Sequence, residues 1–297
     1  MKKGMFNRER TSQSVGNNSF GNTQAQGDIT IYKGMSYEDV KALFYDLFEQ
    51  NLYRLSNEAK EIADQRCKEF IDKFLNQLIS KNQNGLTQAS NPDFQYDLVT
   101  AQIDYARYGD PELADMLVNL LIERTKETQK SQLQIVLNES IATASKLTRE
   151  EYDILTLWFV SEYIAENQEF HNISDLKNFI ETYILSFLDS FNKEKFWYPH
   201  LVYAGCGFIQ AFKVMDIYSI IHNKSAGITP KEFYNIYRYL VSEYPSIEQF
   251  FHVGEVLNNG QNYKPESCMS LTSVGIAIGY ANLCRITGEE FNLSKWL

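Results

Sequence analysis

The sequence predicts an all-α protein, a multi-helix bundle of about ten helices with a short extended N-terminal arm. Three observations lead to this fold class. After Gly34, apolar residues recur at three- and four-residue spacing through most of the chain. Residues typical of helix N-caps, often followed by proline or an acidic residue, stand before many of these segments. The preceding segment 11–34 is instead rich in Ser, Asn, Gln, Thr and Gly, which cannot bury a core by itself.

The arm comprises residues 1–34. It carries five basic residues against two acidic ones, a formal charge of +3, which leaves −13 for the rest of the chain. Because a lone strand cannot satisfy its own backbone, a strand in the arm would pair with residues 291–297 or with the same strand of another copy. The strand-like residues, bounded by glycines and taken as candidates for self-association, are Asp28, Ile29, Thr30, Ile31 and Tyr32.

Capping patterns predict the helix starts of an N-terminal helical body, residues 35–195. Ser36 with Asp39 resembles a capping box, as does Thr148 with Glu151. The sequences NPD at 91–93 and DPE at 110–112 each supply a cap, a proline at the first helical position and an acid in the first turn. A second helix is expected to carry the apolar residues between Cys67 and Leu78 and to end near Asn82, and a further one is expected around residues 133–140. Another is expected to begin at Ser174.

The composition shifts towards Gly and Tyr near 193–199, which places a boundary there. Residues 196–297 are expected to form a C-terminal helical part packed on the same core. Within it, Thr229-Pro230 caps one predicted helix and Ser270 starts the last. Segments 201–215 and 271–283 are too short and too interrupted to span a bilayer, so both are expected to be buried helices. Gly275 and Gly279 form a small-residue stripe and are candidates for close helix packing.

Composition and charge narrow the class of protein. Hydrophobic residues make up 44% and charged residues 22%, as in globular proteins, and the formal charge of −10 argues against nucleic-acid binding. No apolar run follows the basic start, so no secretory signal is expected. The cysteines show no close spacing, which favours reduced thiols in a cytoplasmic protein over disulfides or a zinc site. They are Cys67, Cys206, Cys268 and Cys284.

The chain lacks the strong motifs of catalysis and nucleotide binding, including the Walker loop, GxGxxG, HExxH and GxSxG. We therefore expect no cofactor and no metal, assign no catalytic residue and lean against an enzyme. The adjacent pair Glu150-Glu151 is interpreted as the acidic first turn of a helix. One candidate pocket remains in the aromatic C-terminal part, where His252 and Glu255 have helical spacing. Its residues are His200, Tyr203, His252 and Glu255.

Three blocks carry a resemblance to a known family: MSYEDVK at 35–41, QLQIVLNE at 132–139 and LTSVGIA at 271–277. They resemble an uncharacterised bacterial all-helical family named only by locus labels. The resemblance covers the body from Gly34 onward and implies no activity. In the arm, GNTQAQGD at 21–28 is similar to bacterial amyloid signalling motifs, which accompany helical cell-death or antiviral effector domains.

Three functional hypotheses follow. The leading one is a non-enzymatic bacterial interaction protein, a homo-oligomer that self-assembles through its arm, with a further protein partner also possible there. The second is an antiphage or cell-death effector acting on membranes, the one hypothesis that needs a membrane. The third is a small-molecule sensor or enzyme with its pocket in the C-terminal helical part. None of them involves nucleic acid.

Overall fold

The computed structural model describes residues 36–50, 57–165, 169–188, 198–209, 229–243, 245 and 269–297. Within these ranges the chain is helical apart from a two-stranded sheet, so the all-α prediction is confirmed. The arm and the proposed boundary at 195/196 lie outside the described residues, and both stay predictions.

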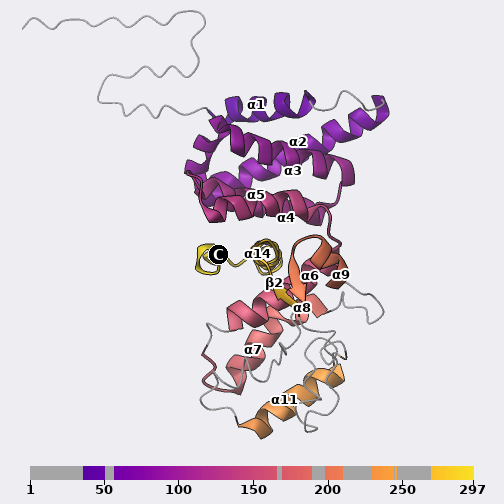
Figure 1. The fold of residues 1–297 in the computed structure, drawn as a ribbon, viewed down its shortest axis with the longest axis vertical. Helices are drawn as coiled ribbons and strands as arrows, with labels where there is room; N and C mark the ends of the chain where they lie inside the picture. The colour runs from indigo at the N-terminus through magenta and orange to yellow at the C-terminus, as the bar shows by residue number, and fades with distance from the viewer. Residues whose placement is uncertain are drawn as a thin grey trace, which may run out of the picture.

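The first part of the body is a stack of helices at one end of the molecule. Figure 1 shows α1 outermost, followed by α2 and α3 and then by α5 and α4. Their bounds are α1 (Tyr37–Glu49), α2 (Asn57–Asn82), η1 (Gln83–Ser90), α3 (Pro92–Tyr108), α4 (Pro111–Lys126) and α5 (Gln132–Ala144).

The capping patterns fix where these helices begin. At α1 the backbone N–H of Asp39 donates to Ser36 Oγ at 3.2 Å, and the N–H of Ser36 donates back to the Asp39 carboxylate at 3.1 Å. Asn91 and Asp110 accept from the backbone N–H groups two residues on, ahead of α3 and α4. The predicted starts of these three helices are therefore confirmed.

The second part begins with a helix that ends in a π-helical turn. Figure 1 shows α7 and α11 at the end of the molecule opposite α1. The elements are α6 (Arg149–Phe159), η2 (Val160–Ile164), α7 (Ile173–Tyr183), α8 (Leu185–Leu188), α9 (Tyr198–Tyr203), α11 (Pro230–Glu243), α14 (Ser273–Thr287) and η5 (Leu293–Lys295).

The last helix, α14, lies in the middle of the fold and contacts α6, α4 and α5 (Figure 1). Two glycines allow this close approach. A Cβ added at Gly275 would overlap the backbone carbonyl oxygen of Cys206, and one added at Gly279 would lie 2.6 Å from that of Leu155. Asn282, which has no exposed surface, joins α14 to α6 by donating to Asp153 at 3.1 Å.

Strand β1 (Gly207–Ile209) corrects the expectation of a continuous helix over 201–215. The buried helix expected over 271–283 is confirmed from Ser273 onward as α14, and strand β2 (Met269–Leu271) precedes it. The two strands pair antiparallel, with Phe208 opposite Ser270. Ser270 thus belongs to β2 and does not start the last helix. Thr272 caps α14 instead, because its Oγ1 accepts from the backbone N–H of Gly275 at 3.2 Å and donates to the carbonyl oxygen of Gly205 at 2.6 Å.

Two other expectations need correction. Helix α7 begins one residue before Ser174, because the side chain of Asn172 caps it by accepting from Asp175 N at 3.0 Å. Residues 291–297, considered as a partner strand for the arm, contain the 3₁₀ helix η5. Here Trp296 packs edge-on against Phe159, with ring centroids 5.0 Å apart. In the described ranges no helix is long and apolar enough to cross a membrane.

Candidate functional site

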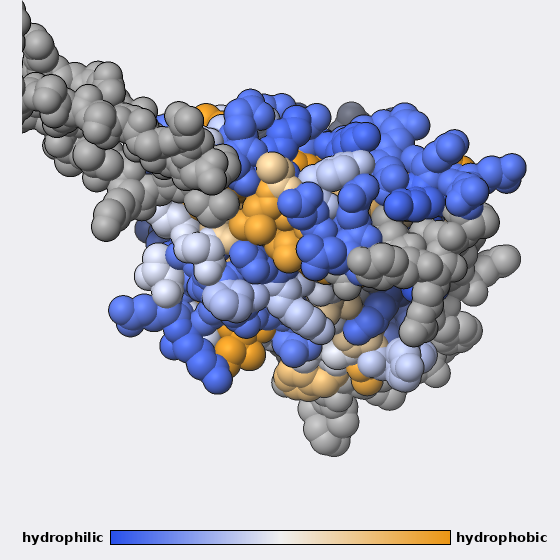
Figure 2. Space-filling model, turned by 90° about the horizontal axis from the view of Figure 1, so that it is seen from above, coloured by the Kyte–Doolittle hydropathy of each residue, from blue (hydrophilic) through white to orange (hydrophobic). Residues whose placement is uncertain are grey.

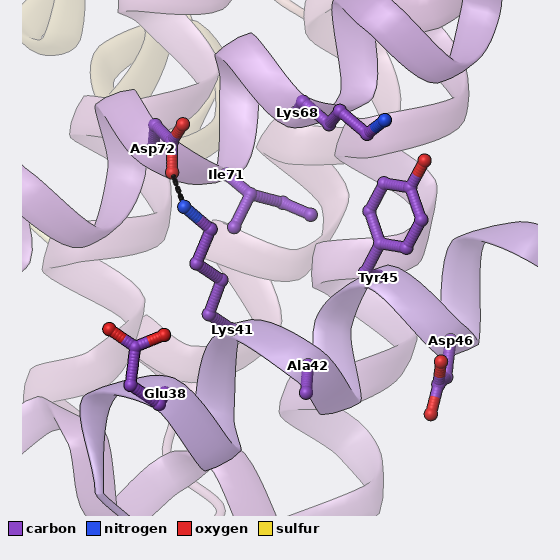
Figure 3. Close-up of a pocket in the computed structure, with 8 residues that line it drawn as sticks. All are labelled: Glu38, Lys41, Ala42, Tyr45, Asp46, Lys68, Ile71 and Asp72. Atoms are coloured by element: carbon purple, nitrogen blue, oxygen red, sulfur yellow. Dashed lines mark hydrogen bonds and ion pairs between the residues drawn. The ribbon is translucent and has the colours of Figure 1, made fainter.

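A groove of about 400 Å³ opens between α1 and α2, directly after the point where the arm ends. Figure 3 shows Ile71 of α2 at its centre, with Lys41 and Tyr45 of α1 on either side. All of the lining residues come from these two helices: Glu38, Lys41, Ala42, Tyr45, Asp46, Lys68, Ile71 and Asp72.

The spacing of apolar residues in α1 explains why the groove forms there. Three residues of α1 are fully or almost fully buried and hold it on the body: Val40, Phe44 and Phe48. The ring centroids of Phe44 and of Phe74 in α2 lie 6.3 Å apart. The adjacent flank of α1, which carries Lys41 and Tyr45, then lies opposite Ile71 of α2 (Figure 3). Seen from the α1 side, the surface is mostly hydrophilic, with a small hydrophobic area near the middle of the face (Figure 2).

Two lysines of the groove are already engaged. Lys41 forms an ion pair with Asp72, and that hydrogen bond raises the pKa of Lys41. Lys68 lies 5.1 Å from the ring centroid of Tyr45, and its hydrogen bond to Tyr45 raises the pKa of Lys68. Three carboxylates and two ammonium groups line the groove, and the carboxylate of Asp46 points away from Ile71 (Figure 3). The groove therefore keeps a slight excess of negative charge.

A second polar cluster contains half of the predicted C-terminal pocket. His200 and Tyr203 lie one turn apart on α9, and their rings stack at 6.2 Å with an angle of 24°. Nδ1 of His200 lies 2.6 Å from Oε1 of Glu151, whose side chain is only 3% exposed. His252 and Glu255, the other two predicted pocket residues, lie outside the described residues.

Glu151 is held on its other side by the N-terminus of α6. Its Oε2 accepts from the backbone N–H of Thr148 at 2.8 Å, which completes the predicted capping box. The predicted place of Glu150-Glu151 in the first turn of a helix is therefore confirmed. The sequence did not predict the contact of Glu151 with His200. The two residues are 49 positions apart, and no local pattern connects them.

A buried ion cluster joins α3, α4 and α5. The side chain of Arg124 has no exposed surface and donates to Asp93 at 2.6 Å and to Asp97 at 3.2 Å. Burial raises the pKa of Asp97 to about 7, against the attraction of Arg124. Burial also acts to raise the pKa of Asp93, but hydrogen bonds from Asn138 and Arg124 outweigh it, so this pKa is lowered. The cluster fixes three helices to one another.

Other potentially reactive groups are in place but shielded. In the described part of the chain, Cys67, Cys206 and Cys284 are free and buried, and burial raises the pKa of all three thiols, that of Cys284 to about 11. Thiols with such a raised pKa are poor nucleophiles at neutral pH. No group of three or more His, Cys, Asp or Glu side chains in the described ranges is arranged to hold a metal ion.

Comparison with known proteins gives a family but no activity. A family model matches residues 34–263 and 234–297, and the family is an uncharacterised one with a locus label. No curated protein and no solved structure matches the chain. The matched residues include both α1 and α14, so the family covers the body from the groove to the central helix.

Proposed function

Since the chain belongs to this uncharacterised family, we propose from its own geometry that it is a non-enzymatic interaction protein that self-associates by exchanging its N-terminal arm. The arm of one copy binds in the α1–α2 groove of another. The observation that carries this proposal is the groove itself, which is lined by α1 and α2 and begins two residues after the N-cap Ser36.

The start of α1 supports an arm that leaves the body. Ser36 has an extended backbone, with φ −69° and ψ 166°, and its capping box with Asp39 marks the N-terminal end of α1. The first described residue of the body is therefore extended and not part of the helix. The strand-like residues of the arm end at Tyr32, four positions before the cap.

The chemistry of the groove suits the arm. The exposed Ala42 offers an apolar contact for Ile29 or Ile31, above the almost fully buried Ile71. The three carboxylates against two ammonium groups in the lining suit an arm with a formal charge of +3. The groove is open to solvent, so water can satisfy the arm's backbone where the helices cannot. Residues 291–297 offer the arm no strand to pair with, because they form η5 and pack on the body.

Light scattering across micromolar concentrations tests the proposal. The full chain is expected to form a complex of more than one copy, and removal of residues 1–34 should give a monomer. Ala42→Arg fills the groove from an exposed helical position and should weaken association at least about tenfold, close to 1.4 kcal/mol. Ile135→Arg is the matched control, since it adds the same charge at an exposed site on α5. A full chain that stays monomeric would refute the proposal.

The two alternative hypotheses rest on less. A membrane effector would need an apolar face to be released from the packed body, and liposome leakage remains its test. A sensor or enzyme is favoured by one observation, the contact of His200 with the buried Glu151. Native mass spectrometry of the purified protein would detect a bound small molecule.

A further inference from the structure

We infer that His200 is a modification site: its Nε2 accepts a phosphoryl group from a phosphoramidate donor. This goes beyond self-association, and it rests on the orientation of the imidazole by Glu151. The Nδ1 atom of His200 is 2.6 Å from Oε1 of Glu151, while the His200 side chain is 44% exposed.

The tautomer of His200 follows from this contact. A carboxylate only accepts hydrogen bonds, so Nδ1 carries the proton and donates it to Glu151. The lone pair then resides on Nε2, which has no hydrogen-bond partner among the described residues. Nε2 is thus the nucleophilic atom of an accessible ring.

Glu151 is well placed to stabilise the charge that develops on attack. When Nε2 bonds to phosphorus, the ring becomes a cation that keeps its Nδ1 proton, and the carboxylate beside that proton lowers the energy of the cation. Only 3% of the Glu151 side chain is exposed, so water screens this attraction little. The backbone N–H of Thr148 holds the other carboxylate oxygen at 2.8 Å, which prevents Glu151 from rotating away.

A phosphoryl group suits the surroundings of His200. Glu151 lies in the first turn of α6, and its carboxylate links the positive end of that helix to the imidazole. Tyr203, stacked on the imidazole and 86% exposed, presents a hydroxyl that can donate to a phosphoryl oxygen. A small tetrahedral group needs no enclosed pocket, and this site is on the surface.

The transfer balances without a redox partner. The Nε2 lone pair forms a bond to phosphorus as the phosphorus–nitrogen bond of the phosphoramidate breaks. The nitrogen of the reagent is protonated, so it takes the electron pair of the broken bond and leaves as ammonia. The product is N-phosphorylated His200, whose Nδ1–H remains hydrogen-bonded to the Glu151 carboxylate.

Another histidine of the same chain provides an internal control. His171 has a side chain that is 75% exposed, and its Nε2 lies 3.9 Å from the carboxylate of Glu169, which is itself 84% exposed. It therefore matches or exceeds His200 in access but lacks a close, buried carboxylate. Any excess reactivity of His200 over His171 reports the effect of Glu151.

The experiment treats the full-length protein with potassium phosphoramidate and follows phosphorylation of each histidine by mass spectrometry under non-acidic conditions. His200 is expected to react at least about tenfold faster than His171, a difference of about 1.4 kcal/mol in activation free energy. Glu151→Gln keeps a side chain that can complete the capping box but removes the charge, so it should bring His200 down to the rate of His171.

Circular dichroism of the Glu151→Gln variant would establish that it folds. Glu151→Asp, which keeps the charge on a shorter side chain, should retain part of the excess rate. Equal rates at His200 and His171, or a His200 rate unchanged by Glu151→Gln, would overturn the inference. Rapid acylation of His200 by diethyl pyrocarbonate without phosphorylation would overturn the assignment to a phosphoryl group.

Discussion

Arg124 of α4 and Asp97 of α3 are paired in the interior, with Nε of the arginine 3.2 Å from the carboxylate and both side chains almost completely inaccessible. The same guanidinium reaches Asp93 at 2.6 Å and the backbone carbonyl oxygen of Glu127 at 2.9 Å. A buried charge is tolerated only when its hydrogen bonds are satisfied, so the position of α4 against α3 depends on this cluster.

Replacement of Arg124 by methionine should lower the free energy of unfolding by about 3–5 kcal/mol, because it removes the buried guanidinium and leaves its acceptors on Asp93, Asp97 and Glu127 without their hydrogen bonds. Urea denaturation followed by circular dichroism measures this. Arg107→Met is the matched control: Arg107 is exposed and its guanidinium lies over the ring of Tyr108 at 4.9 Å, so the loss there should stay below about 1 kcal/mol. Similar losses for the two variants would argue against the structural role of Arg124.

The raised pKa of Asp97 predicts a specific pH dependence. Folded Asp97 keeps its proton up to about pH 7, whereas the unfolded chain releases it near the ordinary value of 3.8. Between these values the folded state binds more protons, so this group makes stability fall as pH rises from about 4 to about 7, by at most about 1.4 kcal/mol per pH unit.

Asp97→Asn removes the titrating proton and retains an acceptor for Arg124. The difference in unfolding free energy between variant and wild type should therefore shift in favour of the variant as pH rises through that window. Urea titrations at several pH values measure the difference. A difference that stays constant with pH would show that Asp97 is ionised throughout.

Gly275→Ala should destabilise the protein by about 1–3 kcal/mol, even though alanine is the better helix former. The added Cβ would overlap the backbone carbonyl oxygen of Cys206, which cannot rotate away. Gly85→Ala is an informative comparison, because there the nearest atoms belong to the side chains of Leu78 and Thr125, at 2.7 Å. Thermal unfolding should show the larger loss for Gly275→Ala, and the reverse order would contradict the close packing of α14.

Local patterns predicted the helix starts well, because capping is decided by residues within three positions of one another. The box of Thr148 with Glu151 and the prolines after Asn91 and Asp110 are examples. The small-residue stripe of α14 likewise pointed to a close approach, although the surfaces approached, Cys206 and Leu155, come from distant parts of the chain.

Contacts between distant segments were beyond local reasoning. The apolar run after Leu201 has a composition compatible with either a helix or a strand, and pairing with Met269–Leu271 decides in favour of β1 at residues 207–209. The same limit applies to the candidate sites. The α1–α2 groove depends on how α1 packs on α2, and the partner of His200 is set by the docking of α9 on α6.

Cysteine cross-linking between two different copies tests arm exchange most directly. One copy carries Thr30→Cys in the arm and the other, with a larger tag, carries Ala42→Cys in the groove, both with Cys268→Ser. The native thiols Cys67, Cys206 and Cys284 are buried. Mild oxidation of the mixture should give a covalent heterodimer, which Ile135→Cys in place of Ala42→Cys should not. If no heterodimer forms, and a chain with both Thr30→Cys and Ala42→Cys cross-links only within itself, the arm binds its own body and the account of self-association is wrong.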